Sequence, residues 1–399
     1  MQMTNVRCAR RDAARRARRL ALACVLAAAP GVALRAGPVG AQEGAGAAAP
    51  AVPLDSRLTV PAGFKVDYFA RGVGGVRFMA LSPEGVVYAT RTGPGQVVRL
   101  PDDNRDGMAD SVVIVARGLR SPHGLAFHKG YLYVANTDGV VRMRLGADGR
   151  AAGEPEKLNS YSAGGGHFTR TIVFGADGAM YVSIGSSCNL CVEEKGDRAA
   201  VMRYDEDGEN GRLYARGLRN AVGLAVHPDT RQIWVSTHER DNLRPEHEDL
   251  PPEEIDILRD GGDFGWPYCY SSGGRPVANP EYNDPARCSR TVTAALEMQA
   301  HSAPMGLAFL KGASQFPREY RGDVLLAFHG SWNRSTPTGA KIVRVRVKDG
   351  KPASYEDFVT GWQGADGRRW GRPVDVLVHK DGSVLISDDA GGAIYRVSH

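Results

Sequence analysis

A phrase of two short apolar strands joined by a tight turn recurs six times along this chain of 399 residues. Apolar and polar residues alternate within each copy, which is the period-2 pattern of β-strands, and pairs such as E-G, K-G and D-G favour turns that need a positive φ. The copies are FMALSPEGVVYAT (78–90), GLAFHKGYLYVAN (124–136), TIVFGADGAMYVSIG (171–185), VGLAVHPDTRQIWVST (222–237), GLAFLKGASQFPREYRGDVLLAFHG (306–330) and VDVLVHKDGSVLISDD (374–389).

A third apolar strand follows each copy, such as QVVRL (96–100) after the first and AIYRV (393–397) after the last. Four-stranded units that repeat at roughly 45 residues are typical of β-propellers. We therefore predict an all-β fold over residues 58–399, a six-bladed β-propeller of four-stranded antiparallel blades. The strand FKVDYFA (64–70) is expected to complete the last blade, and insertions are expected at 259–305 and 331–340. A β-sandwich or two small β domains is the alternative.

The N-terminus carries a basic segment, the apolar run LALACVLAAAPGVAL (20–34) and small residues at Val39 and Ala41. This order predicts a signal peptide over 1–41, followed by a flexible leader over 42–57. The run is shorter than the about 20 residues of a membrane span, so no span is expected. We expect an exported protein, periplasmic or secreted. The paired arginines permit the twin-arginine route without establishing it, and lipidation at Cys24 is a weaker alternative.

The basic charge belongs to this N-terminal segment. The formal net charge is +5, but residues 1–41 hold eight arginines and one aspartate, a charge of +7, which leaves about −2 for the remainder. Nucleic acid is therefore not an expected partner.

Four cysteines follow the predicted signal peptide, and an even count in an exported chain favours disulfides. We predict the pairs Cys188–Cys191 and Cys269–Cys288. The C-x-x-C spacing also suits a redox pair or half a zinc site, although no second ligand pair lies nearby.

Polar residues that the repeats do not share gather between the predicted strands, where propellers bind ligands at one end of the channel. A histidine in GGGHFTRTIVF can act as a general base, and the Arg-Asn pair of YARGLRNAVGLAVHP can hold a carbonyl or an anion. The acidic loop STHERDNLRPEHEDLPPEEIDIL suits calcium, and cations in FHGSWNRSTPTGAKIVRV and WGRPVDV can clamp a polyanion. For each segment alone, an ordinary solvated loop is the competing interpretation.

A second acidic segment, DDNRDGMAD (102–110), has spacing like that of a D-x-N-x-D-G calcium loop. The closing residue departs from that motif, and a polar linker within a blade is the alternative. The candidate ligands of a structural calcium are Asp102, Asn104, Asp106 and Asp110.

Six segments in this order resemble the glucose/sorbosone dehydrogenase family, whose members are soluble six-bladed propellers that use pyrroloquinoline quinone (PQQ) and calcium. They are HFTRTIVFGADGAMYVSIGSSCNLC, ARGLRNAVGLAVHP, GGDFGWPYC, HSAPMGLAF, HGSWNR and WGRPVDV. The sequence is most similar to the branch of sorbosone dehydrogenase-like proteins and aldose sugar dehydrogenases. The resemblance runs from about residue 60 to the C-terminus.

This resemblance implies that His167 is the base that takes the proton of the substrate hydroxyl while a hydride passes to the quinone. Arg219 and Asn220 match the pair beside the quinone carbonyl. Main-chain oxygens are implied as calcium ligands in the loop Glu239, Arg240 and Asp241. Further cofactor contacts are implied for Arg334, Arg372, Lys341 and His123.

Two departures from the family concern substrate and metal. Glucose-oxidising members have an aspartate before the base, where this chain has Gly166, and the calcium loop here differs in length and is more charged. The predicted function is a quinoprotein dehydrogenase of a sugar or related hydroxy-aldehyde. A calcium-dependent hydrolase such as a sugar lactonase, or a binding propeller without activity, is the alternative. The chain has no C-x-x-C-H haem motif, so a separate electron acceptor is expected, a cytochrome or the quinone pool.

Overall fold

The computed structural model describes residue 54, residues 57–243 and residues 248–399. The predicted signal peptide and most of the predicted leader lie outside the described residues. Within the leader, Leu54 is buried in the core, and its carbonyl accepts from the backbone N–H groups of Arg57 and Leu58, so ordered packing begins before residue 58. No helix among the described residues is long and apolar enough to cross a membrane.

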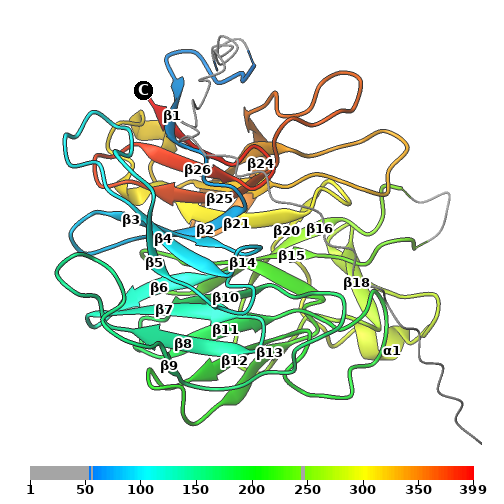
Figure 1. Ribbon diagram of the computed structural model, residues 1–399. Helices are drawn as coiled ribbons and strands as arrows, with labels where there is room; N and C mark the ends of the chain where they lie inside the picture. The colour runs from blue at the N-terminus through cyan, green and yellow to red at the C-terminus, as the bar shows by residue number, and fades with distance from the viewer. Residues whose placement is uncertain (1–53, 55–56, 244–247) are drawn as a thin grey trace, which may run out of the picture. The chain divides into compact units, whose positions relative to one another are not determined.

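The first three blades are antiparallel sheets that follow one another along the chain (Figure 1). Blade 1 comprises β2 (Val76–Leu81), β3 (Val87–Arg91), β4 (Gln96–Leu100) and β5 (Val113–Ala116). Blade 2 comprises β6 (Leu125–His128), β7 (Tyr131–Asn136), β8 (Gly139–Met143) and β9 (Glu156–Lys157). Blade 3 comprises β10 (Arg170–Phe174), β11 (Met180–Ile184), β12 (Ala200–Tyr204) and β13 (Arg212–Arg216), with the short β17 (Gly262–Asp263) parallel to β13.

The last three blades follow the same order. Blade 4 comprises β14 (Asn220–Val226), β15 (Ile233–His238), β16 (Glu253–Ile257) and β20 (Leu296–Met298). Blade 5 comprises β21 (Pro304–Phe309), β22 (Val324–Phe328), β23 (Lys341–Lys348) and β24 (Lys351–Val359). Blade 6 comprises β25 (Pro373–Val378), β26 (Val384–Asp388), β27 (Ala393–Ser398) and β1 (Lys65–Arg71).

The prediction that an N-terminal strand closes the ring is confirmed. Strand β1 pairs antiparallel with β27, from Lys65 opposite Ser398 to Arg71 opposite Ala393. In Figure 1 the blue β1 accordingly lies beside the red strands at the C-terminal end. The innermost strands also contact one another in sequence around the ring, β2 with β6, then β10, β14, β21, β25 and back to β2. The predicted six-bladed propeller is therefore correct.

The predicted insertion at 259–305 is more than a loop. It supplies β20, the outer strand of blade 4, together with the hairpin of β18 (Cys269–Ser272) and β19 (Arg275–Ala278) and the one-turn helix α1 (Pro285–Cys288). Two short 3₁₀ turns, η2 (Leu310–Gly312) and η3 (Arg318–Tyr320), lie between β21 and β22. Both predicted disulfides form, and Cys269–Cys288 ties β18 to α1.

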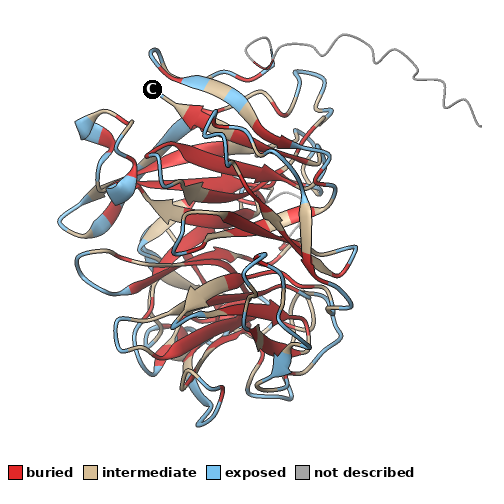
Figure 2. Ribbon diagram, turned by 60° about the vertical axis from the view of Figure 1, so that its left-hand side comes forward, coloured by how far each residue is buried: buried red, intermediate tan, exposed pale blue. Residues whose placement is uncertain are grey.

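Alternation along each strand places apolar side chains between neighbouring blades, where they are buried (Figure 2). Trp234 of β15 packs in one cluster with Leu326 and Phe328 of β22, so it joins blade 4 to blade 5. The turns between the first two strands of a blade need a positive φ, which Gly85 (92°) and Gly382 (86°) adopt, as the E-G and D-G pairs predicted.

Candidate active site

One end of the central channel collects most of the polar residues predicted to be functional. The first two strands of each blade are antiparallel, so the start of the innermost strand and the end of the second strand lie at the same end. His167 precedes β10, Arg219 precedes β14 and Arg372 precedes β25, whereas Asp241 follows β15 and Asp389 follows β26. The topology therefore brings together residues that lie more than 200 positions apart.

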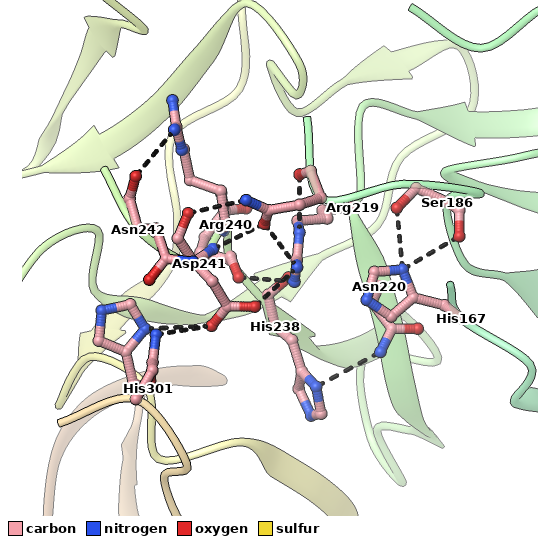
Figure 3. Close-up of polar contacts among 12 residues, drawn as sticks. His167, Ser186, Arg219, Asn220, His238, Arg240, Asp241, Asn242 and His301 are labelled. Carbon is pink, nitrogen blue, oxygen red and sulfur yellow. Dashed lines mark hydrogen bonds and ion pairs between the residues drawn. The ribbon is translucent and has the colours of Figure 1, made fainter. Parts of the chain in front are cut away.

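His167 has one ring nitrogen held by the protein and the other without a hydrogen bond among the described residues (Figure 3). Its Nδ1 lies 3.0 Å from the carbonyl oxygen of Ser186 and 2.9 Å from the Ser186 hydroxyl, so Nδ1 carries the proton. Burial, followed by the charge of Arg219, lowers the pKa of His167 to about 4. The ring is therefore neutral at ordinary pH, with the Nε2 lone pair available to accept a proton.

Arg219 is 4% exposed, and protein oxygens surround its guanidinium edge. Nε donates to the carbonyl of Asn189 (3.1 Å) and Nη2 donates to the side chain of Asn189 (2.9 Å) and to Asp241 Oδ2 (3.1 Å). Nη1 donates to the carbonyls of Glu239 (2.7 Å) and His238 (3.4 Å). Because the N–H groups in the guanidinium plane already donate to protein oxygens, Arg219 can act on a ligand through the charge on the flat face of the guanidinium.

Asn220 and His238 form a second hydrogen-bonded line beside His167. His238 Nε2 donates to the carbonyl of Pro304 at 2.7 Å, which leaves Nδ1 to accept from Asn220 Nδ2 at 3.3 Å. Burial, then the proximity of His167, lowers the pKa of His238 to about 3, so this ring is also neutral. A side chain at Gly185 would overlap both His167 and Asn220, so a glycine here lets the two residues approach each other.

The predicted calcium loop follows β15, but its three side chains point to different partners. The Glu239 carboxyl is buried, and burial raises its pKa to about 7. Arg240 turns away to Glu281 (2.6 Å) and Asn279 (3.2 Å). Asp241 alone joins the site through its carboxylate: burial would raise its pKa, but His301 and Arg219 together hold that pKa below its ordinary value.

The loop around Asp241 offers oxygen atoms of the kinds that calcium binds. Asn333 donates its Nδ2 to Asp241 Oδ1 at 3.0 Å, and its own Oδ1 is buried with no hydrogen-bond partner. The carbonyl of Arg240 likewise accepts no hydrogen bond among the described residues. Hard cations such as calcium prefer carboxylate, amide and main-chain oxygens. The fit therefore rests mainly on backbone and amide oxygens, not on a cage of carboxylates.

A cationic cluster occupies the opposite side of the channel end. Arg77 of β2 pairs with Asp389 at 2.5 Å, and His329 contacts the other oxygen of Asp389 at 3.0 Å. His123 is fully buried, and its Nε2 lies 3.3 Å from Arg77 Nη2. Arg372 donates Nε to the carbonyl of His329 at 3.2 Å, and burial lowers its pKa. Asp388 also lies here and accepts from the Arg372 backbone N–H at 2.7 Å. The guanidinium groups of Arg77 and Arg372 are suited to the carboxylates of a polyanion.

Two predicted cofactor contacts are engaged elsewhere. Lys341 forms an ion pair with Asp357 of the outer strand β24 at 2.6 Å. Arg334 binds the carbonyl of Glu248 at 2.6 Å and the carboxylate of Asp249 at 2.7 Å. The cofactor contacts of Lys341 and Arg334 therefore stay predictions, whereas Arg77, Arg219 and Arg372 lie at the channel end.

The second predicted calcium loop lies between β4 and β5, on the outer part of blade 1. Its carboxylates accept from the loop's own backbone: Asp102 from the N–H groups of Asp106 and Gly107, and Asp110 from that of Asp103. Asn104 Oδ1 also accepts from Asp106 N–H. A structural calcium in this loop stays a prediction.

Sequence reasoning missed several members of the site, including Arg77, Ser186, Asn189 and Asp389. Most belong to strand ends with no distinctive motif. Asn189 is the exception, because the C-x-x-C motif brackets it, and a disulfide around a polar residue is a signal that could have been followed.

Residues 58–399 match the model of the family described as TrAA12-like. The chain belongs to the TrAA12-like family. This TrAA12-like chain is 28% identical over 364 residues to an uncharacterized protein of Borreliella burgdorferi, with 86% of this chain and 91% of the relative covered. It is 23% identical over 412 residues to a pyrroloquinoline quinone-dependent pyranose dehydrogenase of Coprinopsis cinerea, which covers 86% of this chain and 54% of that relative, so the chain spans about half of the fungal protein.

Solved structures share the fold of the TrAA12-like chain. The holo form of the PQQ domain of the Coprinopsis cinerea pyranose dehydrogenase superimposes with a TM-score of 0.76 at 21% identity, covering 86% of this chain and 97% of the other. A calcium structure of a Trichoderma reesei family AA12 enzyme gives a TM-score of 0.75 at 22% identity, with the same coverage. The resemblance to PQQ-dependent sugar dehydrogenases that the motifs indicated is thereby confirmed.

Proposed function

We propose that this protein is a PQQ- and calcium-dependent dehydrogenase that oxidises a sugar or a related hydroxy-aldehyde, with His167 as the general base. The observation that carries the proposal is that a neutral, oriented His167 and the buried Arg219 lie at the same end of the propeller channel. The relatives described as PQQ-dependent pyranose or sugar dehydrogenases support the same chemistry.

The residues at this channel end fit both cofactors. The quinone carries several carboxylates, for which Arg372 and Arg77 supply cations on one side of the channel, and the flat face of Arg219 supplies charge on the other. For calcium, the Arg240 carbonyl and the orphaned Asn333 oxygen would supply ligands beside the Asp241 carboxylate, which Arg219 and Asn333 already contact. When bound, PQQ supplies the acceptor for the hydride of the carbinol carbon, and calcium supplies a Lewis acid.

The chain itself contributes a base and a fixed charge. The Ser186 carbonyl and hydroxyl hold the His167 Nδ1–H, so Nε2 faces a substrate hydroxyl with its lone pair and takes the hydroxyl proton. Once Nε2 has taken this proton, the ring is positively charged. The same Ser186 oxygens, which accept from Nδ1–H, stabilise that charge. Arg219 holds positive charge where negative charge develops in the transition state, without reorganising, because its edge is already bonded.

Gly166 leaves room where glucose-oxidising relatives of this kind have an aspartate. A Cβ at this position would be in ordinary van der Waals contact with Ser187, at 3.5 Å from its carbonyl oxygen, so crowding alone does not require the glycine. We infer a substrate whose hydroxyls are gripped less tightly at this point than those of glucose. We also propose that the protein acts outside the cytoplasm, in keeping with its two disulfides, and passes electrons to a separate carrier.

The test is turnover. Purified protein is incubated with PQQ and calcium, and reduction of an artificial dye is followed with a panel of aldoses, sorbosone and simple alcohols. We expect PQQ-dependent reduction with at least one aldose or hydroxy-aldehyde, and its loss when a calcium chelator is present during loading. Absence of turnover across the panel, with no quinone absorbance retained by the protein, contradicts the proposal.

A further inference from the structure

The disulfide-closed loop Cys188–Asn189–Leu190–Cys191 contacts Arg219 and Asp241 directly and reaches His167 through Ser186. It follows β11 after residues 185–187, and its contacts to Arg219 and Asp241 place it beside the ends of the first two strands of blade 4. Asn189 uses its backbone carbonyl and both polar atoms of its side chain in hydrogen bonds.

Asn189 fixes the plane of the Arg219 guanidinium. Its carbonyl accepts from Arg219 Nε at 3.1 Å and its Oδ1 accepts from Arg219 Nη2 at 2.9 Å, so a single residue grips two adjacent donors of the fork. A two-point contact of this kind sets orientation as well as position. Trp266 Nε1 donates to the same carbonyl at 3.2 Å and so holds the loop in place.

The same asparagine also holds the backbone of Asp241. Asn189 Oδ1 accepts from the Asp241 N–H at 2.8 Å, and Asn189 Nδ2 donates to the Asp241 carbonyl at 2.8 Å. Asp241 in turn gives its carboxylate to Arg219 and Asn333. The asparagine therefore couples the arginine to the loop that is expected to bear calcium.

The loop reaches the base through Ser186. The Ser186 hydroxyl donates to the Cys188 carbonyl at 2.6 Å, and its oxygen lies 2.9 Å from His167 Nδ1. Because the hydroxyl proton is committed to Cys188, the oxygen is left to accept from His167, which favours the tautomer with Nε2 unprotonated. Glu193, which follows the loop, accepts from the N–H and the hydroxyl of Ser187 at 2.5 and 2.9 Å and so ties the two ends of the loop together.

From these contacts we propose that the Cys188–Cys191 loop is the positioning element of the site, with Asn189 as the residue that orients Arg219 and Asp241 and the disulfide as the constraint that keeps it there. The inference deepens the proposed dehydrogenase function and rests on it for its kinetic consequence. The structural part stands independently, since it concerns hydrogen bonds within the protein.

The test uses three variants of the full chain. Asn189→Ala removes the side-chain bonds to Arg219 and Asp241, whereas Asn189→Asp keeps the acceptor oxygen. Cys188→Ser combined with Cys191→Ser opens the loop while leaving Asn189 intact. Val192→Ala, at a side chain that is 54% exposed beside the loop, is the matched control.

The first readout is hydrogen exchange of the Asp241 amide without any cofactor. We expect exchange about 10- to 100-fold faster in Asn189→Ala and in the double serine variant, because the bond to Asn189 Oδ1 is lost or loosened. Val192→Ala should stay near wild type, and Asn189→Asp should lie between the two, because it keeps the acceptor for the Asp241 N–H but loses the Nδ2 donor to the Asp241 carbonyl. Unchanged exchange in both Asn189→Ala and the double serine variant overturns the proposal, whatever the protein does with PQQ.

The second readout is kinetic, with PQQ and calcium loaded. We expect kcat to fall about 10- to 100-fold in Asn189→Ala with a smaller change in KM, and Asn189→Asp to recover part of the loss. A kcat in Asn189→Ala equal to that of Val192→Ala contradicts the positioning role. If wild type itself shows no turnover, the dehydrogenase assignment fails, and the exchange experiment still decides the role of the loop.

Discussion

Replacing His167 by alanine is expected to lower kcat with PQQ, calcium and substrate by about 10²- to 10⁴-fold, the range contributed by a positioned general base. The reason is geometric. Ser186 holds Nδ1–H, and Nε2 is the free ring nitrogen at the channel end, so removal of the ring removes the acceptor for the hydroxyl proton. Dye reduction with the best substrate of the panel measures the loss.

The matched control for this variant is His128→Gln. His128 stacks on Phe174 and contacts Glu206, away from the channel end, so its replacement should leave kcat within about twofold. Circular dichroism and thermal unfolding confirm that both variants are folded. If the alanine variant at His167 keeps more than about a tenth of wild-type kcat, the base lies elsewhere.

Replacing Arg219 by alanine is expected to lower kcat by about 10²- to 10³-fold, as removal of a preorganised electrostatic group does. It also leaves the Asp241 carboxylate and three loop carbonyls short of a donor in a buried place. Breaking a buried pair in this way destabilises by about 3–5 kcal/mol. Urea unfolding checks the stability, and dye reduction checks kcat.

The pH dependence separates this electrostatic role from simple misfolding. Burial and the Arg219 charge lower the pKa of His167 to about 4, and the neutral ring is the active form. In wild type kcat/KM should therefore stay level down to about pH 5 and fall as pH drops through about 4. Without Arg219 the pKa of His167 rises, so the fall begins at higher pH.

Arg219→Lys keeps the charge without the planar fork and should leave the acid limb nearly in place while kcat drops. An acid limb that does not move in Arg219→Ala contradicts the role assigned to the arginine.

The blades were predictable from sequence because the first three strands of each blade alternate apolar and polar residues. Every blade has the same need to bury one set of side chains and expose the other, so the pattern repeats. Apart from β1, which was predicted, the outer strands were harder to recognise because they have little to bury: β9 is two exposed residues, and β20 lies within the predicted insertion. An outer strand pairs along one edge only and faces solvent, so the apolar pattern in its sequence is weak.

The place of His167, Arg219 and Asn220 at one end of the channel was predictable because a motif surrounds each of them, and their roles stay proposals. Lys341 and Arg334 show the limit of this approach, because a cation in a loop does not reveal which carboxylate it will pair with. Arg77 and Asp389, which are 312 positions apart, illustrate the same limit, since only closure of the ring brings them to 2.5 Å.

Titration of the purified protein with PQQ, with and without calcium, tests the central claim most directly. Quinone absorbance on the protein should saturate at one equivalent when calcium is present, and should weaken strongly with a chelator or in Arg372→Ala. Retention of no quinone under either condition, together with metal-dependent hydrolysis of sugar lactones that ignores PQQ, would contradict the account and favour a propeller hydrolase.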